Sequence, residues 1–358
     1  MPKDPDLPDS PPDLGQPAAI RREPFLVSEA EAGQKLLQFL TRRLAGAVPG
    51  SALLRAIRTG QVRVDGGRKQ PFFRLAVGQQ VRVPPFGQAG PGGSSEGSTE
   101  GSSIPVGTVV SASVSPGAAQ PTPAPLPLDI VFENADLVAV AKPAGLCAHA
   151  GTRHKDSVAD RLKALYAGTP FLPVLAHRLD KDTSGILLAA KSYAELRRLG
   201  DLFALGGGGG GVKKMYLAWV DGVWPGQGTE LVEDRLDRLE LAEGQVAGRK
   251  KIVRGKTKED GQDAGKLARA EVTPLVRKRQ ATLMLVRLLT GRTHQIRVQL
   301  SLRGHPVISD SVYGRKVRGV PMLLHALRLD LPERVLFFPP PWAGPFSVPG
   351  KILESLRS

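Results

Sequence analysis

The chain has 358 residues, of which 41% are hydrophobic, and Cys147 is its single cysteine. This length allows two or three domains with a sizeable core, and one cysteine excludes an internal disulfide. No apolar run approaches the roughly 20 residues that span a bilayer, and residues 1–13 lack the apolar core of a signal peptide. We therefore expect a cytoplasmic protein without redox chemistry, in which Cys147 is a small buried residue.

The net charge is +15 at pH 7. Lysine and arginine side chains that neutralise phosphates release condensed counterions, so this charge suits a polyanionic partner, and nucleic acid comes first. A generally basic proteome or an anionic membrane surface is the alternative that the charge alone leaves open.

The first compact segment follows a stretch rich in Pro and Asp, residues 1–24, which we expect to be a disordered tail. Within residues 25–85, apolar residues recur at helical spacing over 36–44 and 53–57, and this spacing predicts two short helices. Two alternating polar and apolar runs within 61–83 then predict a small β-ribbon.

This segment is basic, with ten Lys or Arg residues against three Asp or Glu. Its order of two helices, the GQVRVDGGRK turn and the closing VGQQVRVPP resembles the S4 RNA-binding domain, whose basic helix face meets RNA phosphates. A small helical domain with a solvated charged face is the alternative. Residues 86–125, rich in Gly, Ser, Pro and Ala, indicate a flexible linker. The resemblance implies phosphate contacts at Arg42, Arg43, Arg55, Arg58 and Arg63.

A second domain, residues 126–358, carries the remaining elements. Six glycines at 206–211 predict a mobile loop, and the charged, Gly-rich residues 227–266 fit either an irregular β segment or a basic loop. Apolar periodicity predicts strands over 128–134, 137–145, 186–190, 212–222 and 283–289, and helices over 158–165, 192–203 and from a turn at Gly291 to Leu300.

The stretch HRLDKDTSGILLAAKS, residues 177–192, places charged residues before a turn and a buried strand. Thr183, Ser184 and Gly185 are turn-forming residues, and the apolar run after them is typical of a core strand. Such an arrangement can display a reactive carboxylate, for which Asp180 and Asp182 are the candidates. A solvated loop is the alternative that these residues alone leave open.

Five motifs occur in the order and spacing of the RluA family of RNA pseudouridine synthases, and the resemblance covers roughly residues 128–332. They are HRLDKDTSG, KKMYLAWVDG, TGRTHQIRVQL, GHPVISDSVYG and LLHALRL. The resemblance implies an α+β fold, with a mainly antiparallel mixed sheet in the catalytic domain beside a small S4-like domain. It also implies that uridine in RNA is isomerised to pseudouridine, with no cofactor and no metal. The S4-like segment resembles the arrangement of the RluC and RluD type enzymes, which modify large-subunit (23S) ribosomal RNA.

The resemblance assigns the catalytic nucleophile to Asp180 and leaves Asp182 as a loop residue. A carboxylate can add to the ribose C1′ or assist proton abstraction only when it is ionised, and an adjacent guanidinium favours the ionised form. The family supplies this cation from the GRTHQIR segment. We choose Arg297 over Arg292, for which phosphate binding is the alternative.

Two further residues match family positions at the active site. Tyr216 matches the tyrosine that stacks on the target base and can take part in removing the C5 proton, although the residue alone is typical of a core aromatic. Arg178 matches the arginine that enters the RNA where the base is extruded, and a phosphate contact is its alternative. His177 is expected at the RNA, and we expect it and His294 to orient loops by hydrogen bonds.

The six histidines lack the spacing and acidic neighbours of a metal site. Asp310 and Tyr313 are expected to be structural turn residues that flank the site. The expected partner is RNA, either 23S ribosomal RNA or a ribosome assembly intermediate, and we expect a monomer that binds no membrane. A transfer RNA substrate and a non-catalytic RNA-binding assembly factor are the alternatives.

Overall fold

The computed structural model describes residues 23–44, 47–86, 127–150, 156–207, 209–239, 251–254 and 265–358. The chain divides into two compact units, Met1–Thr122 and Pro123–Ser358, called here the N-terminal and the C-terminal unit. The tail and linker expected at 1–24 and 86–125 lie almost entirely outside the described residues. No helix in the described parts of the chain is long and apolar enough to cross a bilayer.

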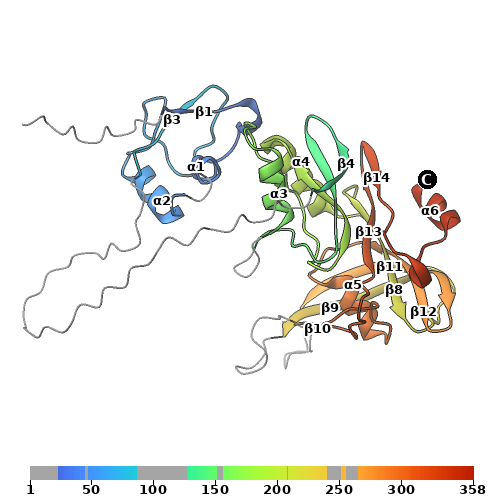
Figure 1. Cartoon of the computed structure of the whole chain (residues 1–358). Helices are drawn as coiled ribbons and strands as arrows, with labels where there is room; N and C mark the ends of the chain where they lie inside the picture. The colour runs from blue at the N-terminus through green and yellow to red at the C-terminus, as the bar shows by residue number, and fades with distance from the viewer. Residues whose placement is uncertain are drawn as a thin grey trace, which may run out of the picture. The chain divides into compact units, whose positions relative to one another are not determined.

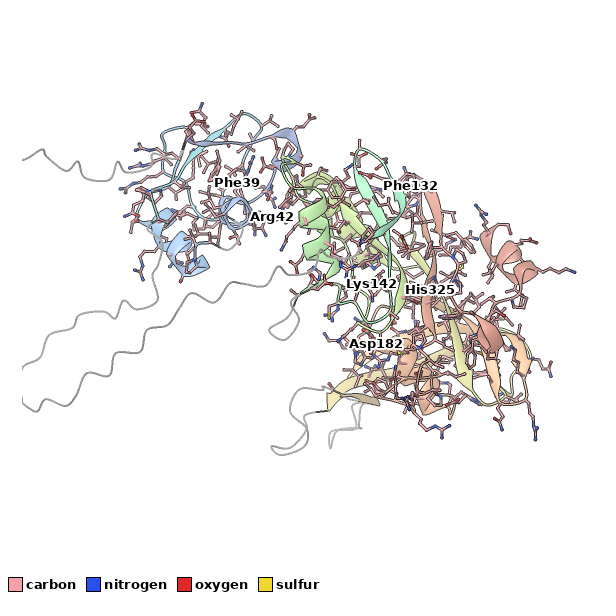
Figure 2. All side chains as sticks on the ribbon, viewed as in Figure 1. Phe39, Arg42, Phe132, Lys142, Asp182 and His325 are labelled. Carbon is pink, nitrogen blue, oxygen red and sulfur yellow. The ribbon has the colours of Figure 1, made fainter. Side chains whose placement is uncertain are left out.

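The N-terminal unit contains the two expected helices, α1 (Leu36–Arg43) and α2 (Gly50–Arg58). Its described strands form one antiparallel sheet in the order β1 (Phe25–Leu26), β3 (Gln80–Arg82) and β2 (Arg63–Val64), and a short 3₁₀ helix, η1 (Glu29–Glu31), precedes α1. Phe39 is fully buried in the core between these elements (Figure 2). The predicted helices and β-ribbon are therefore confirmed, while the S4 identity of the unit stays a prediction.

The C-terminal unit is organised around one mixed sheet, in which eleven strands take part among the residues described (Figure 1). Of the described pairings between strands of this sheet, only that between β13 and β7 is parallel. This agrees with the expected α+β fold and its mainly antiparallel sheet. The strand order is β10 (Lys251–Arg254), β9 (Glu230–Leu239), β11 (Lys266–Lys278), β12 (Ala281–Leu288), β8 (Lys213–Asp221), β13 (Leu324–Leu331), β7 (Ser184–Ala190), β5 (Leu137–Lys142) and β4 (Asp129–Glu133), with β14 (Arg334–Phe337) on β13 and β6 (Val174–Leu175) on β7.

Helices pack against both faces of this sheet. On β8, Tyr216 and Ala218 belong to one hydrophobic cluster and Leu217 and Trp219 to another, as the alternation of side chains along a strand requires. The first cluster includes residues of α3 (Val158–Leu165) and α5 (Gln295–Leu302). On the opposite face lie α4 (Tyr193–Leu205), a 3₁₀ helix, η2 (Gly344–Phe346), and α6 (Gly350–Arg357).

The described part of residues 227–266 forms regular strands, β9 and β10, and not a basic loop. Along β9 the inward positions are Val232, Asp234 and Leu236, so one of the three is a carboxylate. Asp234 is 5% exposed and accepts hydrogen bonds from Gln299 and Arg303. A buried carboxylate is tolerated there because it is paired.

Two smaller expectations need correction. The turn after Asp180 lies at residues 181–182, because Ser184 and Gly185 already pair with β13 as part of β7. Gly185 has φ +111°, and a Cβ at this position would overlap the Ala326 backbone, so glycine is required there. Cys147 is half-buried and not fully buried, since it lies in the loop that leads to α3.

Candidate active site

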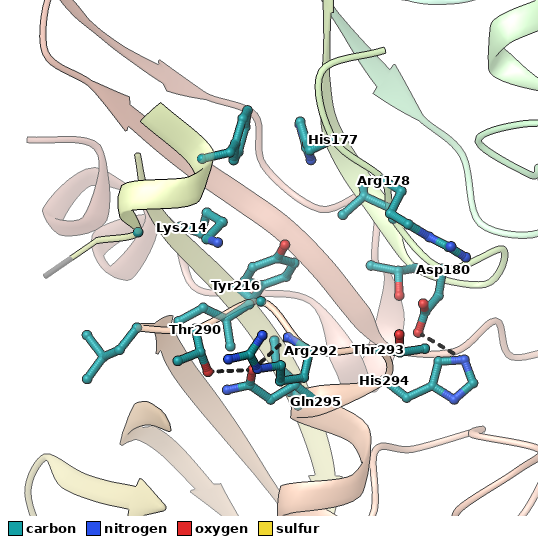
Figure 3. A pocket seen from close by; sticks show the side chains of 18 of the residues that line it. His177, Arg178, Asp180, Lys214, Tyr216, Thr290, Arg292, Thr293, His294 and Gln295 are labelled. Atoms are coloured by element: carbon teal, nitrogen blue, oxygen red, sulfur yellow. Dashed lines mark hydrogen bonds and ion pairs between the residues drawn. The ribbon is translucent and has the colours of Figure 1, made fainter. Parts of the chain in front are cut away.

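A cleft of about 570 Å³ opens on the Tyr216 side of the sheet, and polar side chains of the motifs HRLDKDTSG, KKMYLAWVDG and TGRTHQIRVQL line it (Figure 3). Its lining comes from the loop before β7, from β8, from the end of α4 and from the turn before α5. The expected site residues that line it are His177, Arg178, Asp180, Tyr216, Arg292 and Arg297.

Asp180 is held at the cleft by one arginine. The Asp180 side chain is 18% exposed, and its Oδ2 accepts a hydrogen bond of 3.0 Å from Nη1 of Arg297. Arg292 is exposed, and its Nε donates instead to the Leu267 carbonyl at 2.9 Å. Of the two candidate arginines, Arg297 is therefore the one that contacts Asp180.

A second carboxylate fixes Arg297 from behind. Asp310 has no exposed surface and accepts two hydrogen bonds from the Arg297 guanidinium, 2.7 Å from Nε and 2.8 Å from Nη2. It also accepts the backbone N–H groups of Val312 and Tyr313 at 2.8 and 3.1 Å. Arg297 thus bridges a buried carboxylate and one that faces the cleft, which orients Asp180.

The charges of Asp310 and Arg297 depend on each other. Burial alone would raise the pKa of Asp310, but the hydrogen bonds and charge of Arg297, together with two backbone N–H groups, hold that pKa below its ordinary value. Burial also opposes the charge of Arg297, yet Asp310 and then Asp180 leave the pKa of its guanidinium raised. A neutral replacement for Arg297 would leave Asp310 without its cation, and a neutral replacement for Asp310 would leave Arg297 paired with Asp180 alone among the described residues.

His294 closes the other side of Asp180. It takes the left-handed conformation, φ +54°, immediately before α5, and its Nε2 lies 3.7 Å from Oδ2 of Asp180. Its Nδ1 is 2.9 Å from the Tyr313 hydroxyl, which also accepts the Ile252 N–H at 2.9 Å. Burial lowers the pKa of His294 more than the charge of Asp180 raises it, so the imidazole is neutral near pH 7.

Tyr216 forms a wall of the cleft close to Asp180 (Figure 3). Its side chain is on β8 and is 7% exposed. Burial, and next the charge of Asp180, raise the pKa of its hydroxyl, so the phenol stays protonated near pH 7. The ring therefore offers a fixed apolar surface inside the cleft.

The loop that carries Asp180 is held by two further side chains. Nζ of Lys142, which is 1% exposed, donates to the carbonyl oxygens of Pro143, Leu146 and Lys181 at 2.8–2.9 Å (Figure 2). Nε2 of His177 accepts the Leu188 N–H at 3.1 Å, and burial lowers the pKa of His177 to about 3. The orienting role expected for His177 agrees with this contact, whereas its RNA contact stays a prediction.

Sequence reasoning missed part of this arrangement. Asp310 does cap a turn, as expected, but it also binds Arg297, and Tyr313 contacts His294. The available signal was an aspartate shortly after the apolar pair Val307-Ile308, because a carboxylate that becomes buried needs a cation. The described residues contain no group of three or more His, Cys, Asp or Glu side chains that could hold a metal ion.

The five arginines of the N-terminal unit that were expected to contact RNA differ in their hydrogen-bond partners and in their exposure. Arg43 binds Glu31 through Nε and Nη2 at 2.6 and 2.7 Å, and Arg42 donates to Gln34 at 2.8 Å. Arg55 and Arg58 lie exposed on α2, and Arg63 is half-buried on β2. The positions of Arg55 and Arg58 therefore suit an external anion best.

Comparison with known proteins identifies the family. The sequence profile described as RNA pseudouridylate synthase matches residues 136–302. The chain is 35% identical over 290 residues to the ribosomal large subunit pseudouridine synthase C of Haemophilus influenzae, covering 81% of this chain and 78% of that protein. It is 34% identical over 290 residues to the protein of the same name from Escherichia coli K12, covering 80% and 78%.

Among solved structures, the human RNA pseudouridylate synthase domain containing 1 protein superposes with a TM-score of 0.51. The superposition covers 65% of this chain and 95% of that chain at 24% identity, so it supports the fold alone. Together the fold and the sequence relatives define an RNA pseudouridylate synthase. Within that class, the chain belongs to the RluA family.

Proposed function

We propose that this chain isomerises uridines of large-subunit ribosomal RNA to pseudouridine, with Asp180 as its catalytic carboxylate. Membership of the family supports the reaction, and the names of the relatives, ribosomal large subunit pseudouridine synthase C, support the substrate. The observation that carries the assignment of Asp180 is its position at the cleft that Tyr216 also lines, with its carboxylate bound by Arg297. A ribosomal substrate would place the enzyme in the cytoplasm, where a monomer suffices because one chain supplies the whole cleft.

The reaction replaces the bond from C1′ to N1 with a bond from C1′ to C5, and a proton is lost from C5 while one is gained at N1. The bond between N1 of uracil and C1′ of ribose breaks, and its electron pair stays with the base. The base turns, a bond forms between C5 and C1′, the C5 proton leaves, and N1 takes up a proton. The carboxylate of Asp180 can add to C1′ or assist the proton transfer, and either role splits a difficult step into easier ones.

The other side chains of the cleft support that step. In this proposal the Tyr216 ring stacks on the uracil, and a protonated hydroxyl makes stacking its main role rather than proton removal. Arg178 is exposed at the cleft and fills the gap left when the base is extruded from the RNA. Arg292, also exposed, binds a neighbouring phosphate.

The N-terminal unit contributes RNA affinity in this proposal. An S4-like domain would meet phosphates with its basic helix face, and the exposed Arg55 and Arg58 on α2 are the contacts we propose first. Arg43 holds Glu31, so its contribution is mainly structural.

The test uses ribosomal RNA from cells that lack this protein. That RNA is incubated with the wild-type protein or with Asp180→Ala, and pseudouridines are mapped chemically; transfer RNA from the same cells is treated in parallel. The proposal expects new pseudouridine in large-subunit RNA with the wild type only. Modification of transfer RNA alone would overturn the substrate, and equal modification by both proteins would overturn the role of Asp180. Binding without modification would favour an assembly factor.

A further inference from the structure

Two lysines of the C-terminal unit are deeply buried, and they differ in one respect. Lys142 is 1% exposed, and its ammonium group donates to three backbone carbonyls. Lys214, on β8, is 8% exposed, and its Nζ has no hydrogen bond or ion pair with any residue that the structure describes. Lys214 lacks the backbone acceptors that satisfy Lys142, so a carbonyl or an anion that enters the cleft can satisfy its ammonium group.

Lys214 lies inside the active-site cleft. It is two residues before Tyr216 on the same strand, so both side chains are on one face of the sheet, and both line the cleft (Figure 3). Its Nζ is 5.9 Å from the centre of the Phe203 ring and lies close to Gly291, where a Cβ would be only 3.3 Å away. Burial lowers the pKa of Lys214, as expected for an ammonium enclosed by apolar side chains and backbone.

The position of Lys214 relative to Asp180 suggests which group it meets. In Figure 3 the Tyr216 ring lies between Asp180 on one side and Lys214 on the other. If the ribose C1′ faces Asp180 and the uracil stacks on Tyr216, the far edge of the base points towards Lys214. That edge carries carbonyl oxygens, which accept hydrogen bonds from an ammonium group.

We propose that Lys214 is a further catalytic residue, which donates a hydrogen bond to a carbonyl oxygen of the target uracil and stabilises the negative charge that forms there. The inference rests on the function proposed above. When the N1–C1′ bond breaks, its electron pair remains on the base, and the charge spreads from N1 onto O2 and O4. A cation fixed beside the base stabilises such a charge more than water does, because it needs no reorganisation. The same electron pair then forms the C5–C1′ bond, and the stabilised charge disappears.

The inference is tested by replacing Lys214 with Met, which preserves the volume and removes the charge, and with Arg, which preserves the charge. The probe is large-subunit ribosomal RNA transcribed with uridine that carries tritium at C5, because the reaction releases this hydrogen into water. Lys213→Met is the matched control, since Lys213 is the neighbouring lysine and is exposed. Single-turnover rates at saturating RNA are measured together with RNA affinity and the thermal unfolding midpoint.

We expect Lys214→Met to lower the single-turnover rate about 100-fold, the size of effect found when one charge-stabilising donor is removed. RNA affinity and the unfolding midpoint should stay close to those of the wild type, Lys214→Arg should recover part of the rate, and Lys213→Met should match the wild type. A normal rate for Lys214→Met would overturn the inference. A lower RNA affinity combined with a wild-type rate at saturating RNA would also overturn it, because that result assigns Lys214 to a backbone phosphate. If the wild type itself releases no tritium, the proposed function fails instead.

Discussion

The carboxylate of Asp310 gives the sharpest prediction about how the site is held. Replacing it with Asn preserves the shape but removes the charge and leaves one acceptor oxygen for four donors, two from Arg297 and two from the backbone. Arg297 is only 4% exposed, so its charge would lose its nearest compensation in a poorly solvated place. We expect Asp310→Asn to destabilise the C-terminal unit and to release Asp180 from its fixed orientation.

The size of the destabilisation follows from the burial of the ion pair between Asp310 and Arg297. Removing one partner of a buried ion pair costs about 3–5 kcal/mol, which corresponds to a midpoint lower by about 6–20 °C for a unit of this size. The pKa of Asp310 is lower in the folded than in the unfolded protein. The ionised carboxylate therefore contributes its full stabilisation above the unfolded-state pKa of about 3.9, and this stabilisation is lost as the pH falls through the folded-state pKa. The difference in the free energy of unfolding between wild type and Asp310→Asn should therefore be constant near neutral pH and become smaller only in acid.

Thermal unfolding followed by circular dichroism measures this difference. The control is Glu333→Gln, which removes an exposed ion pair with Arg198, 2.8 Å long with both side chains at least 35% exposed. That change should cost about 0–1 kcal/mol. If Asp310→Asn were no more destabilising than Glu333→Gln, the account of Arg297 as a bridge between two carboxylates would be refuted.

Two further predictions concern the framework and the N-terminal unit. Gly185→Ala should destabilise the C-terminal unit by about 2–5 kcal/mol, because φ is positive and a Cβ would overlap β13. Gly228→Ala, in open space, is its control, and equal midpoints for the two variants would contradict the packing of β7 on β13. Replacing Arg55 and Arg58 together with Gln should reduce the slope of log affinity against log salt by about 1.4 for single-stranded RNA contacts. Arg357→Gln, exposed on α6, controls for net charge, and an unchanged slope would show that α2 does not bind RNA.

Periodicity predicted elements such as β8, whose inward residues are mostly apolar. Tyr216 and Ala218 were expected on one face of a strand, and they share a hydrophobic cluster. The residues of β9 fitted either an irregular β segment or a basic loop, because Asp234 occupies an inward position and interrupts the apolar alternation. Its partners, Gln299 and Arg303, follow it by 65 and 69 residues, so local sequence gives no indication that this carboxylate is satisfied.

Only those site residues whose roles the family motifs imply could be predicted from the sequence. The contact of Asp180 with Arg297 spans 117 positions, and only the resemblance indicated it. Asp310 and Lys214 could not be given roles from the sequence, because their meaning depends on burial and on which partners surround them. Asp310 is a buried carboxylate that pairs with a cation, and Lys214 is a largely buried cation that pairs with no carboxylate among the described residues.

The most direct test of the account compares two neighbouring carboxylates on one RNA. Asp180→Asn and Asp182→Asn are similar in shape to the residues they replace, and each removes one charge from the same loop. We predict that Asp182→Asn releases tritium from C5-labelled ribosomal RNA at nearly the wild-type rate, whereas Asp180→Asn releases none above background while still binding the RNA. Equal tritium release by Asp180→Asn and the wild type would contradict the central claim, that Asp180 performs the chemistry in this cleft.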